Sequence, residues 1–270
     1  MPHATLNGTR IHYEVYGQGD PVLLVSGLGG AAVGWLLQVK DLSARYQVIT
    51  LDNRGVGESD VPDLPAYPTA LLADDAAALL DHLGVARAHV VGASMGGTIA
   101  MELAIRHAKR VRSLSICCSW ARGDGRFIQT IRSWMALAPL MSLEDRFRYL
   151  LFPQLYSPAF LADPAAVAEA LKRSLAYPHP TRPEGLARQG EGLIAWNGTR
   201  IKEIKRIKAP TQVLVGKEDI LTPPAFSREL AELIPGSRLR LLPGAHAFFI
   251  EEAPRLNGAL LEFFKGVSAE

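Results

Sequence analysis

Three residues of this 270-residue chain, Ser94, Asp219 and His246, have the side chains of a nucleophilic catalytic site. A serine hydroxyl is a weak nucleophile at its ordinary pKa. Attack on a carbonyl carbon therefore needs a base within hydrogen-bond reach and an acid that orients the base. The sequence predicts acyl transfer with Ser94 as the nucleophile, His246 as the base and Asp219 as the acid.

The segment around Ser94 is the most specific of the three. It reads Gly92-Ala93-Ser94-Met95-Gly96 and lies between an apolar run at 89–91 and a helix-like stretch at 97–107. A serine on a sharp strand-to-helix turn is held in strained backbone with its hydroxyl above the sheet, and the flanking glycines remove Cβ atoms that would collide. The new helix directs free N–H groups at the reaction centre. An ordinary glycine-rich turn is the alternative.

Asp219 and His246 each follow an apolar strand-like run, at 212–215 and 238–242. Ligands of open α/β sheets bind at the carboxyl ends of the strands, which is where both residues are expected. Glu218, next to Asp219, and Asp124, which follows another predicted strand, are alternative acids. Three further histidines are expected to be structural, namely His82, His89 and His107.

The elements that must position these residues alternate between strands and helices. Helical patterns, such as 70–83 and 225–234, separate most of the apolar runs, which predicts right-handed crossovers and a mostly parallel sheet flanked by helices. The near-continuous apolarity indicates burial on both faces of the sheet. Residues 10–16 alternate in polarity and predict an antiparallel edge strand. The other predicted strands are 22–25, 48–51, 89–91, 114–116, 212–215 and 238–241.

This alternation fails between residues 121 and 201, where four helical segments are separated by prolines and no strand is evident. An all-helical insertion between two sheet strands cannot join the sheet and should cover one end of it. We therefore expect a core domain of residues 1–120 and 202–270, with a helical cap (lid) of residues 121–201 that makes a pocket.

Composition excludes several other classes. The chain has 29 basic and 27 acidic residues, a balance that gives no case for nucleic acid or an anionic membrane surface as a partner. No signal sequence or membrane span is evident, which favours a cytoplasmic protein.

Cys117 and Cys118 are expected to be reduced core residues. No metal cluster or phosphate-binding loop is evident and no cofactor is expected; residues 52–59 indicate a compact turn whose polar groups bond neighbouring loops.

The order serine, acid, histidine and three further motifs resemble the α/β-hydrolase superfamily over nearly the whole chain. The motifs are Ser26–Gly30, Asp52–Ser59 and Gly244–Phe249. Within the superfamily the chain is most similar to bacterial 3-oxoadipate enol-lactonases and arylesterases. The resemblance implies the α/β-hydrolase fold and two backbone N–H donors to the oxyanion, from Leu28 and Met95.

The expected substrates are small-molecule carboxylic esters or lactones. Arg122 and Arg126 are candidates for holding a substrate carboxylate. Serine at position 94 argues against a haloalkane dehalogenase, in whose family pattern aspartate is the nucleophile. Carbon–carbon bond hydrolases, cofactor-free perhydrolases and ligand receptors with slow turnover remain alternatives, and the oligomeric state is not predicted. Candidate pocket walls, equally plausible as core residues, are Trp35, Met95, Trp120, Trp134, Phe147, Trp196 and Phe248.

Overall fold

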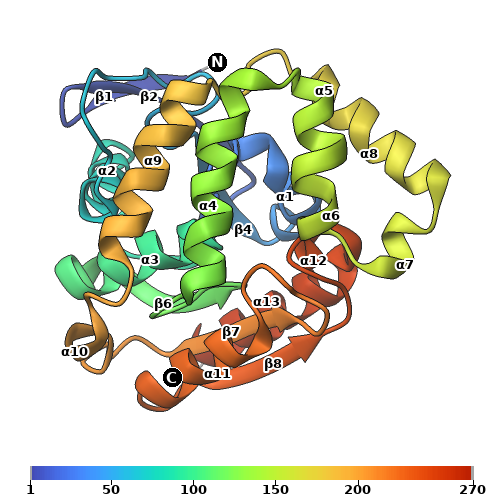
Figure 1. The fold of residues 1–270 in the computed structure, drawn as a ribbon. Coiled ribbons are helices and arrows are strands. Elements are labelled where there is room, and N and C mark those ends of the chain that lie inside the picture. Colours follow the sequence, from blue (N-terminus) through green and yellow to red (C-terminus); the bar gives the residue numbers. More distant parts are fainter. Residues whose placement is uncertain (1, 269–270) are drawn as a thin grey trace.

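The computed structural model describes residues 2–268, and its centre is an eight-stranded sheet (Figure 1). The strand order is β1-β2-β4-β3-β5-β6-β7-β8. All neighbours from β4 to β8 run parallel, whereas β2 pairs antiparallel with both β1 and β4. The strands are β1 His3–Leu6, β2 Thr9–Tyr16, β3 Asp20–Val25, β4 Tyr46–Leu51, β5 Ala88–Ala93, β6 Val111–Cys117, β7 Thr211–Gly216 and β8 Arg238–Leu242.

The predicted strands are all confirmed, including the antiparallel strand β2. Strand β1 was not predicted, although Asn7-Gly8 between β1 and β2 is a strong hairpin signal; both residues have positive φ, 47° and 75°. The prediction of burial on both faces is wrong for β8, because β8 is an edge strand whose residues are mostly half-buried.

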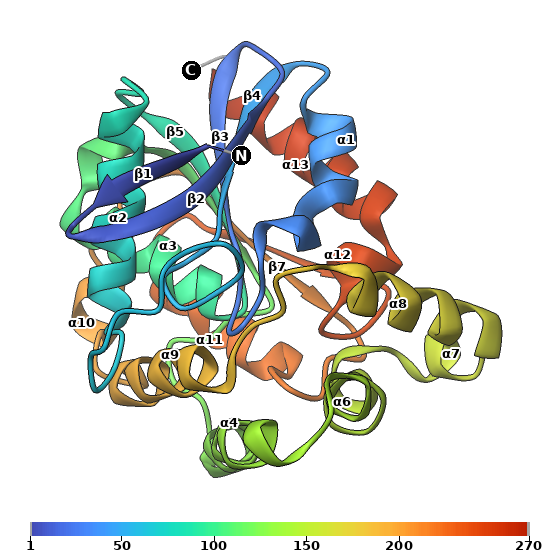
Figure 2. The same cartoon turned by 90° about the horizontal axis from the view of Figure 1, so that it is seen from above.

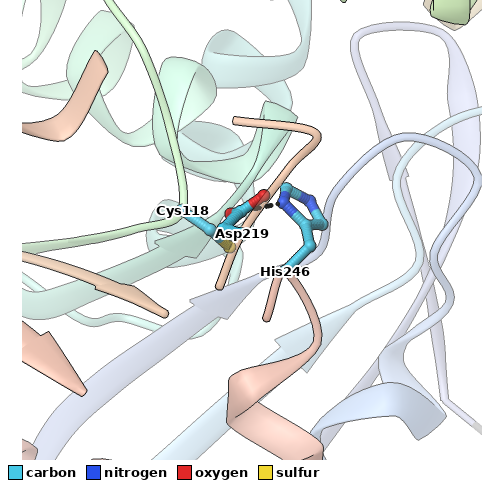
Figure 3. Close-up of side chains that lie close together, drawn as sticks. All are labelled: Cys118, Asp219 and His246. Atoms are coloured by element: carbon cyan, nitrogen blue, oxygen red, sulfur yellow. Dashed lines mark hydrogen bonds and ion pairs between the residues drawn. The ribbon is translucent and has the colours of Figure 1, made fainter. Parts of the chain in front are cut away.

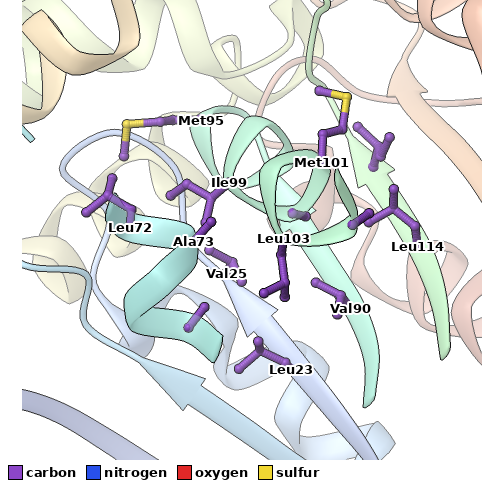
Figure 4. Close-up of a cluster of buried hydrophobic side chains, with 14 of the residues drawn as sticks. Leu23, Val25, Leu72, Ala73, Val90, Met95, Ile99, Met101, Leu103 and Leu114 are labelled. Carbon is purple, nitrogen blue, oxygen red and sulfur yellow. The ribbon is translucent and has the colours of Figure 1, made fainter. Parts of the chain in front are cut away.

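Helices cover both faces of the sheet (Figure 2). One face carries α2 (Thr69–His82) and α3 (Met95–Arg106), and the other carries α1 (Leu36–Leu42) and α13 (Ala253–Ser268). Successive strand residues point to opposite faces. Leu23 and Val25 of β3 therefore pack beneath α2 and α3, in the hydrophobic cluster drawn in Figure 4, while Val22 and Leu24 pack on the other side. Two further core helices are α11 Pro224–Leu233 and α12 Phe248–Glu251.

Between β6 and β7 the described residues form helices and connecting loops, and none of them lies in a strand. In the cap, α4 lies beside α9, and α9 also contacts α2 of the core. The division of the chain into two domains stays a prediction. The cap helices are α4 Gly125–Leu137, α5 Leu143–Asp145, the π-helix η4 Arg146–Leu151, α6 Phe152–Leu155, α7 Pro158–Leu161, α8 Pro164–Ala176 and α9 Pro183–Trp196; α10 Ile201–Ile204 crosses the predicted cap boundary.

Two glycine contacts place the cap over the carboxyl ends of the strands. A Cβ on Gly185 of α9 would lie 1.9 Å from the carbonyl oxygen of Gly55, in the loop after β4, and a Cβ on Gly29, after β3, would lie 3.0 Å from Leu186. The cap therefore covers the sheet edge at which the catalytic residues were predicted. No helix within residues 2–268 has the length and apolarity needed to cross a bilayer.

Candidate active site

Ser94 occupies the sharp turn between β5 and α3. Its backbone angles are φ 56° and ψ −122°, in a region that L-residues rarely adopt and that costs roughly 1–3 kcal/mol. The neighbouring glycines explain how the turn closes. A Cβ on Gly92 would lie 2.1 Å from the carbonyl oxygen of Gly96, and a Cβ on Gly96 would lie 2.1 Å from that of Val25. The sequence around Ser94 thus forms the strained strand-to-helix turn that it predicts.

The loop after β3 runs alongside this turn. A Cβ on Gly27 would lie 3.0 Å from the Cβ and 3.6 Å from the Oγ of Ser94, so this glycine allows the close approach. Leu28, one predicted oxyanion donor, is the next residue. Met95, the other, is the first residue of α3, where backbone N–H groups have no partner within the helix. The Met95 side chain is buried in the core near Leu72 (Figure 4), which anchors this end of the helix.

Asp219 and His246 meet from the loops after β7 and β8 (Figure 3). The Nδ1 atom of His246 lies 2.9 Å from Oδ2 of Asp219, and both side chains are almost fully buried. A carboxylate at Nδ1 holds that nitrogen protonated and leaves Nε2 free to accept a proton. This pair therefore has the geometry of an oriented general base.

Asp219 is itself held by the two residues that follow Ile220. Its Oδ1 accepts hydrogen bonds from the backbone N–H groups of Leu221, at 2.9 Å, and Thr222, at 2.8 Å. The Thr222 hydroxyl lies 2.8 Å from Oδ2 of Asp219, 3.1 Å from Nδ1 of His246 and 2.9 Å from the carbonyl oxygen of Cys118. Thr222 was missed by the sequence analysis. The one feature of the sequence that could have indicated Thr222 is its position three residues after Asp219, from which a threonine hydroxyl can hydrogen-bond the aspartate carboxylate.

Cys118 lies beside this pair, and its neighbour Cys117 bonds the turn that carries Ser94. Cys118 has a φ of 42°, its N–H donates to Leu214, and the backbone N–H of Ser94 donates to the carbonyl oxygen of Cys117 at 2.9 Å. Cys117 and Cys118 are both free and buried, which confirms that prediction. The position of Cys118 against the acid was not predicted.

The side chains of Cys118, Asp219 and His246 could in principle hold a metal ion, since each offers one ligand atom within 4.8 Å of the others. Burial, reinforced by the neighbouring Asp219 carboxylate, raises the pKa of the Cys118 thiol well above its ordinary value. A metal-binding cysteine must be deprotonated, so a neutral thiol is a poor ligand. The cluster fits an acid–base pair better than a metal centre.

The alternative acids occupy other places. Glu218 is exposed, and Asp124 caps α4 by accepting a hydrogen bond from the N–H of Phe127 at 2.8 Å. Of these three acids, Asp219 is the one that hydrogen-bonds His246. The structural histidines are elsewhere: burial lowers the pKa of His89 to about 4, His107 pairs with Asp74, and His82 contacts Tyr13.

Among the candidate pocket aromatics, Phe147 is half-buried and packs against Phe152 in the cap, and the others are buried. Trp35 packs against Phe249 with the two rings tilted by 37°, and Phe248 lies with Trp35 in the cluster beneath α1 and α13. Trp196 donates its indole N–H to Glu102 at 2.8 Å, so it fastens the end of the cap to α3. The indole N–H groups of Trp120 and Trp134 have no hydrogen-bond partner among the described residues. A role of these side chains in binding substrate stays a prediction.

A cleft of about 180 Å³ lies between α4 and the loop that holds Asp219. Arg126 and Phe127 line it from the cap, and Leu221, whose N–H bonds Asp219, lines it from the core. Asp124 is also at the cleft, but its carboxylate caps α4. Arg122, by contrast, is mostly exposed and forms an ion pair with Glu229 at 2.9 Å, which does not favour a role in binding substrate.

The turn at residues 52–59 bonds neighbouring loops as predicted. The buried carboxylate of Asp52 accepts hydrogen bonds from the N–H groups of Ala32, at 2.7 Å, and Glu58, at 3.0 Å, and lies 3.0 Å from His12. The hydrogen bond that the His12 ring donates to the Asp52 carboxylate raises the pKa of His12. These contacts tie the loops after β3 and β4 together, which supports a structural role for this motif.

The fold is that of the α/β hydrolases. Residues 20–253 match the family described as "alpha/beta hydrolase fold", and the chain belongs to that family. It is 37% identical to a protein of Azorhizobium caulinodans provisionally named as the carbamate hydrolase RutD, over 97% of this chain and 98% of that protein.

Two further relatives carry different names. A Mycobacterium tuberculosis protein provisionally named as the non-haem bromoperoxidase BpoC is 33% identical, over 96% of this chain and 99% of its own. The crystal structure of an enol-lactonase from Burkholderia xenovorans is similar with a TM-score of 0.87 and 30% identity, covering 98% of this chain and 100% of that one.

Proposed function

We propose that this protein hydrolyses carboxylic esters or lactones of small molecules through Ser94, His246 and Asp219. The observation that carries the proposal is the buried pair of His246 and Asp219, at 2.9 Å, on the same sheet edge as the strained turn of Ser94. A serine in such a turn and an imidazole oriented by a carboxylate are the parts that acyl transfer requires.

The proposed reaction has two halves. His246 takes the proton of the Ser94 hydroxyl as the oxygen attacks the carbonyl carbon, and Asp219 stabilises the imidazolium that forms. The N–H groups of Leu28 and Met95 hold the oxyanion until the alcohol departs with the proton from His246. Water, activated by His246, then releases the acid from the acyl-enzyme.

The names of the relatives support the ester or lactone class and define the competing activities. An enol-lactone is an ester, and its hydrolase has the same fold at 30% identity. A carbamate also has a carbonyl carbon open to a serine nucleophile, so carbamate hydrolysis is a second candidate, favoured by the 37% identical relative. The name of the bromoperoxidase relative similarly favours perhydrolysis as a third.

A panel of substrates tests the proposal directly. Purified protein is assayed with p-nitrophenyl esters of increasing chain length, γ- and δ-lactones, a p-nitrophenyl carbamate, and peroxide with acetate. Turnover of an ester or lactone at roughly one per second or faster is expected, within the usual range of enzymes. Mass spectrometry after treatment with a fluorophosphonate should find the label on Ser94. An unlabelled protein without ester or lactone turnover would overturn the proposal.

Arg126 is expected to favour substrates that carry a second carboxylate, because its side chain lines the cleft beside the Asp219 loop. For Arg126→Ala, kcat/KM for p-nitrophenyl hemisuccinate should fall about fivefold, the size of one exposed ion pair, with p-nitrophenyl butyrate unchanged. Arg122→Ala is the matched control, since Arg122 pairs with Glu229. An unchanged ratio of charged to neutral ester turnover in Arg126→Ala would remove Arg126 from substrate binding.

A further inference from the structure

We propose that two cap residues, Gln189 and Thr181, are positioning residues of the oxyanion loop, so that seating of the cap on the core sets the geometry of the oxyanion hole. The inference rests on the proposed function, because it assigns Leu28 as an oxyanion donor. The loop after β3 contacts both the turn of Ser94, through Gly27, and the cap, through Gly29.

The loop is a tight turn centred on Leu28 and Gly29. The N–H of Gly30 donates to the carbonyl oxygen of Gly27 at 3.0 Å, and Gly29 has a φ of +66°. A positive φ at the third of four turn residues is the mark of a type II turn, which differs from type I by a flip of the central peptide unit. That central unit joins Leu28 to Gly29, and its orientation decides which turn forms.

Cap side chains bond both peptide groups of Gly29. The N–H of Gly29, which belongs to the central unit, donates to Oε1 of Gln189 at 2.9 Å. The hydroxyl of Thr181 donates to the carbonyl oxygen of Gly29 at 2.7 Å. The N–H of Gly29 already donates to Gln189, so it is not free for a substrate oxyanion. Of Leu28 and Gly29, only Leu28 therefore has an N–H that is available as an oxyanion donor.

Gln189 is a rigid support for the loop. It is fully buried, and its Nε2 donates to the carbonyl oxygen of Arg54 at 3.0 Å. Arg54 is held in turn by two hydrogen bonds to the buried carboxylate of Asp75, at 2.6 and 2.7 Å. The close approach of Gly185 to Gly55 fixes α9 against the same core loop. The amide of Gln189 therefore has little freedom to leave Gly29.

The core holds the ends of the oxyanion loop, and the cap holds its centre. On the core side, Asn53 donates to the carbonyl oxygen of Ser26 at 3.2 Å, and the Ser26 hydroxyl donates to Ala31 at 3.2 Å. If the cap moves away, the Leu28–Gly29 peptide unit loses Gln189 and the following Gly29–Gly30 unit loses Thr181, so the central unit can flip between turn types. The Leu28 N–H belongs to the preceding peptide unit, and after such a flip only the core contacts at Ser26 would hold its direction.

Thr181 allows the cleanest test, because its hydroxyl can be removed at constant volume. In Thr181→Val, kcat for the best ester should fall about tenfold with KM changed less than threefold, short of the roughly 100-fold loss on deleting an oxyanion donor. Thr181→Ser restores the hydroxyl and should recover kcat. Thr199→Val is the matched control. The Thr199 hydroxyl also donates to a carbonyl oxygen at 2.7 Å, but its partner is Trp196, at the end of α9, and not a residue of the oxyanion loop.

A transition-state readout separates positioning from folding. Affinity for an alkylboronic acid, whose tetrahedral adduct with Ser94 uses the oxyanion donors, should fall with kcat in Thr181→Val and in Gln189→Met. Affinity for an unreactive ketone of the same length should not change. Melting temperatures identify any variant that fails to fold. If Thr181→Val or Gln189→Met is such a variant, kcat and boronic-acid affinity are compared between Thr181→Ser, Thr199→Val and the wild type.

Four outcomes decide between these possibilities. Equal losses of kcat in Thr181→Val and Thr199→Val, or boronic-acid affinity that does not follow kcat, would overturn the positioning role. Wild-type kcat in both Thr181→Val and Gln189→Met would do the same. A wild-type protein that turns over no ester and takes no fluorophosphonate label would instead refute the proposed function, which the variants do not test.

Discussion

Replacing Ser94 by alanine is expected to lower kcat for ester hydrolysis by on the order of 10⁴-fold or more, the usual cost of removing a catalytic serine. The variant loses the attacking oxygen but keeps a Cβ, so the strained turn between β5 and α3 needs no rearrangement. Its melting temperature should stay near that of the wild type. Initial rates with the best p-nitrophenyl ester, together with thermal melts, measure both quantities.

Ser227 supplies the matched control for Ser94. It is a buried serine of α11 whose hydroxyl has no hydrogen-bond partner among residues 2–268. Ser227→Ala makes the same chemical change outside the proposed site and should keep wild-type kcat and fluorophosphonate labelling. Retention of more than about a tenth of the activity by Ser94→Ala would exclude Ser94 as the nucleophile, since residues of a triad act as a unit.

The predictable parts of the fold are those set by local pattern. Continuous apolar runs, such as Val22–Val25, predicted the buried strands, because a parallel strand covered by helices needs apolar side chains on both faces. Gly92 and Gly96 gave the turn of Ser94, because a Cβ at either position would collide with backbone. The proline-separated segments between residues 121 and 201 predicted helices without strands, which is what the structure has between β6 and β7.

The unpredicted parts are contacts between distant segments of the chain. Gln189 and Gly29 are 160 residues apart, and nothing in the pattern of α9 marks a glutamine that faces the core. The place of Cys118 depends on the adjacency of β6 and β7 and on a positive φ, neither of which two successive cysteines reveal. The sequence offers three candidate acids and favours Asp219. The hydrogen bond between Asp219 and His246 comes from the packing of two loops that are distant in the sequence.

The second large effect is expected for Asp219→Asn, which should lower kcat by roughly 10³- to 10⁴-fold. The reason lies in how the carboxylate is held. Oδ1 accepts two backbone N–H groups, from Leu221 and Thr222, so the carbonyl oxygen of an asparagine must take that place. Its NH₂ group then faces Nδ1 of His246, which must accept a hydrogen bond and moves the ring proton to Nε2. An imidazole protonated at Nε2 cannot take the proton of Ser94.

Glu218→Gln is the control, because it neutralises the neighbouring acid, which is exposed. It should leave kcat within about twofold of the wild type, as expected for a surface change. The rate of fluorophosphonate labelling should fall in Asp219→Asn and not in Glu218→Gln, since labelling needs the same base. Activity of Asp219→Asn within tenfold of the wild type would mean that His246 is oriented by another group, and the Thr222 hydroxyl, 3.1 Å from Nδ1, would become the first to examine.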